Sequence, residues 1–401
     1  MKKSILILGF LVLSAILFDG GKAVAAANIN EYQNMLSNGA ELLYQSNYSS
    51  AIPYLERAYS IYDTEGESGE TNQAALGLEV CYRNLRDFEK AFKYGLEYQN
   101  SIKKVLGKAT KEYLDRYGYL AYYQLSLKQF DKALELTNEC LQLTEELYGK
   151  ETVEYSEALK TKAMVYQATA TDYSSRQDYY NAMTNGEKAL ELYAQCEGME
   201  SLSYAIMLDN LGKYYNEVGA FEKGYMASLT VLPIFKNVCG EKSMDYLIAL
   251  SNYAGSCDRM GKTREAIDIS HTMLELAEEI LGKDWMGIYV VKDNLANYYL
   301  KLENKEEAIK YRKETFDYWN ANRGDYPTDW LICASNFMID LFSMEKYAEA
   351  KEIGEIVMTD PLFEIVKKQS SGQDIIALMI DIYQKTNEPE KAHELMKKLF
   401  Q

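Results

Sequence analysis

Apolar side chains recur along this chain at intervals of three and four residues, which is the spacing of one face of an α-helix. Two stretches of this kind lie between residues 245 and 282, separated by a short turn at residues 259–263. The apolar stripe of the second stretch consists of Ala266, Ile269, Met273, Leu276 and Ile280. The pattern predicts a unit of two helices joined by a turn, in which each helix has one apolar face.

This unit repeats along the chain. Glycines that end helical stretches recur every 42 residues, with one interval of 49: Gly107, Gly149, Gly198, Gly240, Gly282 and Gly324. We expect these glycines to adopt the left-handed conformation, which costs glycine no steric penalty at a helix end. A second series in the same register places a small residue early in each second helix: Ala91, Ala133, Ala182, Gly224, Ala266, Ala308, Ala350 and Ala392. Two landmarks in one register indicate a stacked array of repeats.

The first helix of the unit carries a small residue followed by tyrosine, as in Leu211-Gly212-Lys213-Tyr214-Tyr215 and Leu295-Ala296-Asn297-Tyr298-Tyr299. Together with the small residues of the second helix, this pattern resembles the tetratricopeptide repeat (TPR), whose usual unit is shorter. The 42-residue period and the joint Leu281-Gly282-Lys283-Asp284 are similar to the kinesin-light-chain subtype. The resemblance implies an all-α fold, a right-handed superhelix (α-solenoid) whose first helices line a concave face.

In this register we predict about nine helix-turn-helix repeats that fill residues 28–401 as one solenoid. They lie near residues 28–68, 69–109, 110–151, 152–200, 201–242, 243–283, 284–326, 327–371 and 372–401. The terminal repeats match the pattern least well, as expected where one face has no neighbour. Because the repeats leave no room for a separate catalytic domain, we expect that the protein is not an enzyme.

The fourth repeat holds seven extra residues within Ala168 to Tyr180. Seven residues make close to two helical turns, so we expect both helices of this repeat to lengthen by a turn without rotating their faces. The alternative is a protruding loop that contacts a partner.

Residues 1–27 are typical of an export signal. Two lysines precede an apolar run from Ile5 to Phe18, and small residues follow, with cleavage expected after Ala25 or Ala27. The run is shorter than the ~20 residues of a membrane-spanning helix, so an uncleaved anchor is the less favoured alternative. We therefore expect a periplasmic or secreted protein that meets the membrane only through this signal peptide.

The chain is acidic, with 60 Asp and Glu residues against 43 Lys and Arg residues and a formal net charge of −17. Proteins bind the phosphate backbone through clustered cations, so nucleic acid is not an expected partner. A neutral or basic protein or peptide fits this charge better.

The six cysteines do not form an obvious disulfide framework. Cys81, Cys140 and Cys257 fall where the repeat expects buried apolar side chains, which predicts buried free thiols. Cys196 and Cys239 end the second helices of adjacent repeats. A bridge between them is the less favoured alternative, because neighbouring helices pack about 8–10 Å apart and a disulfide needs α-carbons within ~7 Å.

Polar residues that repeat on the first helices are the best candidates for binding. One row, spaced by 42 residues, consists of Asn210, Asn252, Asn294 and Asn336, preceded by Asp209, Ser251, Asp293 and Ser335. An asparagine offers both a donor and an acceptor, so a regular row can pair with the backbone of an extended peptide. Alternatively, each asparagine bonds a carbonyl of the neighbouring helix and serves only the stacking.

One turn further along the same helices lie Lys213, Asn216, Asp258 and Asn297, and Gly255 leaves open space among them. We therefore predict a partner-binding groove in the middle repeats. Its expected members are Asp209, Asn210, Lys213, Asn216, Ser251, Asn252, Asp258, Asp293, Asn294, Asn297 and Asn336.

Signatures of catalysis and cofactor binding are not found. The sequence has no glycine-rich phosphate loop, no paired-cysteine zinc spacing and no nucleophile elbow. The two histidines, His271 and His393, are three repeats apart on second helices, which predicts two surface residues on the order of 30 Å apart, too distant to share a metal. We expect neither a cofactor nor a metal.

These observations favour an exported scaffold that holds a polypeptide or an envelope partner in its concave face. One alternative is a sensory or regulatory arm that acts with a separately encoded peptidase or kinase. Another is a groove that binds a small molecule or a glycan through some of the 35 tyrosines. The oligomeric state stays open, although the apolar C-terminal helix with Met396, Leu399 and Phe400 offers a surface for self-association.

Overall fold

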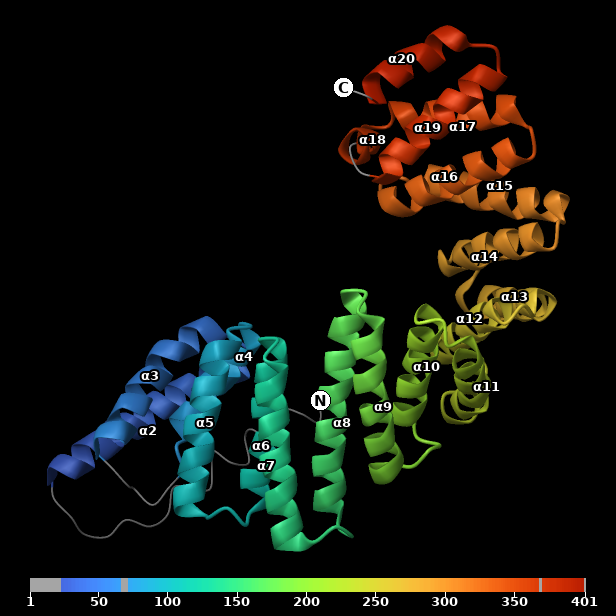
Figure 1. Cartoon of the computed structure of the whole chain (residues 1–401). Coiled ribbons are helices and arrows are strands. Elements are labelled where there is room, and N and C mark those ends of the chain that lie inside the picture. The colour runs from blue at the N-terminus through green and yellow to red at the C-terminus, as the bar shows by residue number, and fades with distance from the viewer. Residues whose placement is uncertain (1–22, 66–70, 368–369, 400–401) are drawn as a thin grey trace. The chain divides into compact units, whose positions relative to one another are not determined.

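The computed structural model describes residues 23–65, 71–367 and 370–399 (Figure 1). Helix is the only regular secondary structure in these residues, which form nineteen helices, α2 to α20. Their contacts cluster into two compact units, Met1–Met207 and Leu208–Gln401, divided within α10 (Leu202–Glu217). The predicted signal peptide lies outside the described residues up to position 22, and the prediction of one continuous solenoid remains a prediction.

Unit 1 is a succession of helix pairs. The pairs are α2 (Ala23–Tyr44) with α3 (Tyr48–Glu65), α4 (Gln73–Asn84) with α5 (Phe88–Val105), α6 (Lys111–Ser126) with α7 (Phe130–Tyr148), and α8 (Val153–Ser175) with α9 (Tyr179–Cys196). The second helix of a pair also packs against the first helix of the next pair. The apolar stripes predicted from the sequence therefore meet between neighbours, which is the arrangement of stacked repeats.

Unit 2 continues the same alternation. After α10 come α11 (Phe221–Val238), α12 (Met244–Arg259) with α13 (Thr263–Leu281), α14 (Gly287–Lys301) with α15 (Lys305–Ala321), α16 (Pro327–Ser343) with α17 (Tyr347–Thr359), the short α18 (Pro361–Val366), and α19 (Ser370–Lys385) with α20 (Pro389–Leu399). The helix α18 was not predicted from the sequence. It begins where Asp360 accepts a hydrogen bond from the Leu362 N–H at 2.9 Å, with Pro361 at its first position.

The turn inside each hairpin follows one rule. Nine turns hold a single residue in the left-handed region, at Ser46, Arg86, Lys128, Gln177, Gly219, Gly261, Glu303, Glu345 and Asn387. At the third of these turns the N–H of Gln129 donates to the carbonyl of Gln124 at 2.8 Å, which closes the preceding helix. The predicted number of helix-turn-helix repeats is thereby confirmed among the described residues, although seven of the nine turn residues are not glycine.

The glycines that end the second helices behave as predicted at five of six positions. Gly107, Gly149, Gly198, Gly240 and Gly282 have φ between 82° and 90°. The prediction is wrong for Gly324, which has no left-handed φ. There α15 ends at Ala321, and the Tyr326 N–H donates to the Asn322 carbonyl at 3.1 Å, so a different turn leads into α16.

One departure from the alanine series has a structural cause. A β-carbon at Gly224 would lie 3.0 Å from the Gly212 carbonyl oxygen and closer still to the Asn216 side chain. The helices α10 and α11 therefore cross here with room only for glycine. Asn216 itself is only 8% exposed and donates to Ser256 Oγ at 2.9 Å.

The extra residues of the fourth repeat are helical, as predicted, but only one helix lengthens. α8 has 23 residues, whereas α9 has 18, the length of α5 and α11. Since seven residues make close to two turns, α8 grows without rotating the faces that pack against α7 and α9. The expected extension of α9 is wrong.

The thiols agree with the sequence analysis. Cys81, Cys140 and Cys257 are buried and free. Burial raises the pKa of Cys140 to about 11, although Thr144 opposes the shift. Cys196 and Cys239 are half-buried and belong to different units. A disulfide between them, the less favoured alternative, therefore remains a prediction.

Among the described residues, none of the helices combines the length and the apolar character that a membrane crossing requires. The same residues contain no group of His, Cys, Asp and Glu side chains that could hold a metal ion. His393 is exposed as predicted, but His271 is half-buried and its Nε2 lies 3.1 Å from Tyr299 Oη. Of the apolar C-terminal residues, Met396 packs against the core of unit 2, whereas the side chain of Leu399 and all of Phe400 lie outside the described residues.

Candidate binding groove

A pocket of about 420 Å³ opens between the first helices α12 and α14 of unit 2. Its lining is Ser251, Gly255, Asp258 and Arg259 from α12, and Asn294, Asn297, Tyr298 and Lys301 from α14. No atom lies within 4 Å of where a β-carbon of Gly255 would be, so this glycine leaves the space that the sequence predicted. Four of the predicted groove residues, one pair from each helix, are thus brought together.

Two of these residues have free hydrogen-bonding groups. The side chains of Ser251 and Asn294 make no hydrogen bond to any other described residue. Both are only partly exposed and sit in the wall of the pocket. A hydroxyl and an amide in such a position can donate to and accept from a ligand without first breaking an internal bond.

Asn297 is held in a defined orientation by Arg312 of α15. Arg312 Nη2 donates to Asn297 Oδ1 at 2.6 Å. Since a guanidinium has only donors, the carbonyl end of the amide must face Arg312, and the NH2 end is left for the pocket. Asn297 therefore presents donors to a ligand.

The same guanidinium forms a buried ionic cluster. Arg312 is 1% exposed, its Nε donates to Asp340 Oδ2 at 2.7 Å, and its Nη1 pairs with Asp293. Burial raises the pKa of Asp340, and the neighbouring Arg312 opposes that rise. Asp293 is thus engaged inside the fold and does not line the pocket.

The charges in the pocket wall are already paired. Lys301 forms an ion pair with Asp258, which also accepts a hydrogen bond from Thr263 Oγ1 at 3.0 Å. Arg259 donates to Glu217 Oε1 at 2.8 Å. The uncommitted groups of the pocket are therefore neutral donors and acceptors, suited to a peptide group and not to proton transfer.

The asparagine row divides between the two roles that the sequence left open. Asn252 Nδ2 donates to both oxygens of Asp209, at 2.9 and 2.7 Å, and so ties α12 to α10. Asp209 is buried, which raises its pKa against the effects of Lys213 and Asn252. Lys213 Nζ lies 3.9 Å from Asp209 Oδ2. These three residues form a link between helices, whereas Asn294 faces the pocket.

The remaining predicted residues lie elsewhere in unit 2. Asn216 is buried against Ser256 and Gly224, so the structure does not bring it to the pocket. Asn210 on α10 and Asn336 on α16 are half-buried and do not line it. Sequence reasoning missed Arg259, Tyr298 and Lys301, although Lys301 falls one turn beyond Asn297 on the same face of α14.

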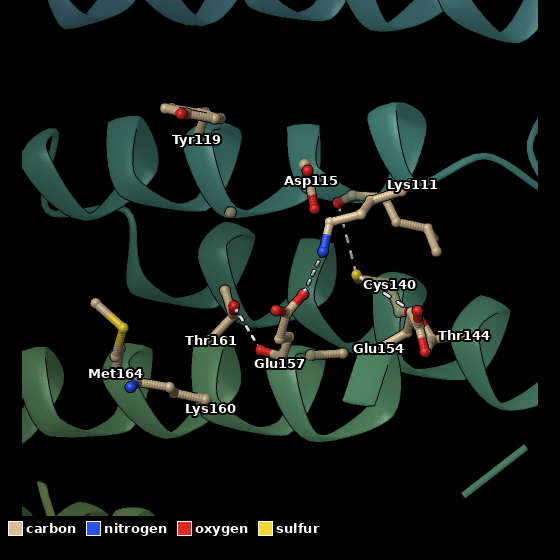
Figure 2. A pocket seen from close by; sticks show the side chains of 13 residues that line it. Lys111, Asp115, Tyr119, Cys140, Thr144, Glu154, Glu157, Lys160, Thr161 and Met164 are labelled. Atoms are coloured by element: carbon tan, nitrogen blue, oxygen red, sulfur yellow. Dashed lines mark hydrogen bonds and ion pairs between the residues drawn. The ribbon is translucent and has the colours of Figure 1, made fainter. Parts of the chain in front are cut away.

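Unit 1 has a pocket of its own, of about 330 Å³, between α6, α7 and α8 (Figure 2). Lys111 Nζ reaches Glu157 Oε2 at 3.3 Å across it, and Cys140 and Thr144 come from α7. Asp115 lies beside this ion pair, and desolvation raises its pKa while Lys111 opposes the shift. This pocket was not predicted from the sequence, because its residues do not repeat the asparagine row.

Consecutive helix hairpins, small residues where the helices cross and nine periodic turns give the described residues a TPR-like fold, and their 42-residue period is similar to that of the kinesin-light-chain subtype. No protein-family model matches the sequence, and no curated protein matches it.

Solved structures with similar coordinates include BtubC (BKLC) from P. vanneervenii, with 17% identity, a TM-score of 0.45, and coverage of 59% of this chain and 92% of that one. The apo form of the quorum sensor NprR from B. thuringiensis has 13% identity and a TM-score of 0.42, over 100% of this chain and 97% of its own. A STAND protein with a tetratricopeptide repeat sensor from Pyrococcus horikoshii has 12% identity and a TM-score of 0.48, over 98% of this chain and 66% of its own. The assignment itself rests on the helix pairs and turns of this chain.

Proposed function

We propose that this protein is an exported, non-enzymatic scaffold that binds a polypeptide in the groove of its first helices. One observation carries the binding role: in the pocket between α12 and α14, Ser251 and Asn294 keep their hydrogen-bonding groups free, and Asn297 is held with its NH2 group available. An extended peptide offers carbonyls and N–H groups that such neutral groups can pair with, whatever its side chains.

The absence of free charge in the pocket supports a binding role over a catalytic one. A general acid or base needs a titratable group that is free to exchange its proton at the working pH. In this pocket Asp258, Arg259 and Lys301 are each engaged in an ion pair. The groups left over bind and orient, and do not exchange protons.

Affinity capture from the native envelope fraction tests the proposal. The mature chain should retain a polypeptide partner, and a Ser251→Ala/Asn294→Ala variant should lose most of it. Asn237→Ala is the matched control, since Asn237 is an exposed asparagine on the second helix α11 of the same unit. Retention of the same partner by the double variant, with the fold intact by circular dichroism, would refute binding in this groove.

Export is tested separately. N-terminal sequencing of the protein recovered from its native source should show a chain that begins at Ala26 or Asn28. The supporting observation is the apolar run that ends at Phe18, followed by small residues. An intact N-terminus on protein recovered from the cytoplasm would contradict export and leave the binding proposal standing.

A further inference from the structure

In unit 2, three consecutive first helices each expose an apolar residue at the equivalent position of the repeat. Ile248 on α12, Val290 on α14 and Ile332 on α16 are 42 residues apart and are 44%, 46% and 56% exposed. We call these three residues the apolar ladder. Leu247 and Leu331, directly before Ile248 and Ile332, and Val291, directly after Val290, are buried, so neighbouring positions already supply the core.

Neither folding nor helix formation explains the apolar ladder. β-Branched residues lose side-chain freedom in a helix and are weaker helix formers than Lys, Glu or Ala, which could occupy an exposed position. Exposed apolar side chains that recur on the same face of successive helices mark an interaction site more often than scattered ones do. Two exposed methionines lie four residues earlier, Met244 at the first position of α12 and Met286 directly before α14, and add apolar area at the start of these helices.

The apolar ladder shares a face with the pocket. Ile248 precedes Ser251 by three residues and Gly255 by seven, and Val290 precedes Asn294 by four, which are the spacings of one helix face. The pocket joins α12 to α14, and the Arg312 cluster joins α14 to α16 through Asp293 and Asp340. An occupant of the pocket that continues along these helices therefore meets apolar side chains one turn away.

The charges around the apolar ladder favour a positively charged occupant. Asp245 and Asp329 lie one turn before Ile248 and Ile332, are exposed, and have no cation within ion-pair distance among the described residues. The lysine and arginine side chains of α12 and α14 are already paired with carboxylates. With the chain at a net charge of −17, this leaves an uncompensated negative field at the apolar ladder.

We infer that the segment held by unit 2 is an extended polypeptide rich in aliphatic and basic residues, whose aliphatic side chains contact the apolar ladder while its lysines or arginines face Asp245 and Asp329. This inference rests on the proposed function and specifies the class of its ligand. Aliphatic contacts provide affinity by removing apolar area from water, and the acidic rim disfavours acidic segments.

Four synthetic peptides test the composition. Each consists of three repeats of one block: Gly-Leu-Lys-Ser, Gly-Leu-Glu-Ser, Gly-Thr-Lys-Ser or Gly-Thr-Glu-Ser. By fluorescence anisotropy, the leucine–lysine peptide should bind at least about tenfold more tightly than any of the other three. Equal binding of the leucine–glutamate peptide, or no measurable binding of the leucine–lysine peptide, would overturn the inference.

Substitutions of the apolar ladder locate the contact. Ile248→Thr/Val290→Thr/Ile332→Thr keeps β-branched residues at exposed positions, and it should weaken binding of the leucine–lysine peptide by about tenfold or more. Met226→Thr/Leu229→Thr changes two exposed apolar residues of α11 and should leave binding unchanged. Equal effects of the two variants would remove the apolar ladder from the interface.

Two further outcomes separate the hypotheses. If the Ser251→Ala/Asn294→Ala variant loses the natural partner while the threonine variant keeps it, the composition inference fails and the proposed function stands. If light scattering shows a dimer that the threonine variant converts to a monomer, and no peptide binds, the apolar ladder is a self-association surface and the inference fails.

Discussion

Loss of the Arg312 guanidinium should destabilise unit 2 by about 3–5 kcal/mol, the cost of leaving buried carboxylates without their cation. The test substitution is Arg312→Ser. At the position equivalent to Arg312, other repeats hold a small residue: Gly95, Thr137, Gly186, Ser228, Ser270 and Gly354. The backbone at this position therefore accepts serine. The expected loss is a large share of a typical unfolding free energy of about 5–15 kcal/mol.

The structure explains why the loss should be large. Arg312 bonds Asp340 at 2.7 Å and Asn297 at 2.6 Å and pairs with Asp293, while it is itself 1% exposed. Serine cannot reach any of these groups. Asp340, at 8% exposure, would remain desolvated beside the like charge of Asp293.

Urea denaturation at pH 7, followed by tryptophan fluorescence, measures the effect. All three tryptophans, Trp285, Trp319 and Trp330, belong to unit 2, so the signal reports this unit alone. Arg264→Ser is the control, because Arg264 is exposed on α13 and forms no ion pair among the described residues. A loss below about 1 kcal/mol, or one equal to that of the control, would show that the Arg312 cluster does not stabilise unit 2.

The pH dependence gives an independent check. Burial holds the pKa of Asp340 above its usual value even with Arg312 opposing the shift, and removal of Arg312 should raise it further. A carboxyl whose pKa is raised by folding binds more protons in the folded state, so its destabilising effect grows as the pH rises above about 4. The deficit of Arg312→Ser should therefore be smaller near pH 4.5 than at pH 7, and an unchanged deficit would contradict the assignment.

Three further substitutions or reactions test the fold. Glu303→Gly should stabilise unit 2 by about 1 kcal/mol in urea denaturation, because Glu303 has a left-handed φ of 60°; a destabilised variant would contradict this. Gly224→Ala should destabilise it by about 1–3 kcal/mol, since the new methyl group meets the Gly212 carbonyl oxygen at 3.0 Å, and Asn216→Ser in the same background should restore part of the loss. Burial raises the pKa of four thiols, those of Cys81, Cys140, Cys257 and Cys333, to about 11 or 12. Iodoacetamide at pH 8 should therefore modify these thiols only after unfolding, and mass spectrometry would detect the modification.

Much of the architecture follows from local signals that the sequence carries in every repeat. Apolar residues at helical spacing predict the hairpins, and the small residues that mark helix crossings set their register. The prediction fails where a local feature has no repeat to support it. Gly324 ends α15 with a turn of a different type, and the extra residues of the fourth repeat all enter α8.

The groove was predicted only in part, because a repeat pattern assigns residues to a helix face but not to a partner. The pattern placed Ser251, Asn294 and Asn297 on the right helices. It could not show that Asn252 is engaged with Asp209, since that bond joins two different repeats.

The helices, their pairing and their period can be read from the amino-acid order, because short-range spacing controls each of these. Which polar groups are satisfied inside the fold depends on how the hairpins stack. Glu79 and Arg116 of unit 1 and Arg312 of unit 2 occupy positions where other repeats carry different residues, and their ion pairs join helices from neighbouring hairpins. Such contacts depend on atoms brought together by stacking, and so the free hydrogen-bonding groups of the groove become visible only once the helices are in place.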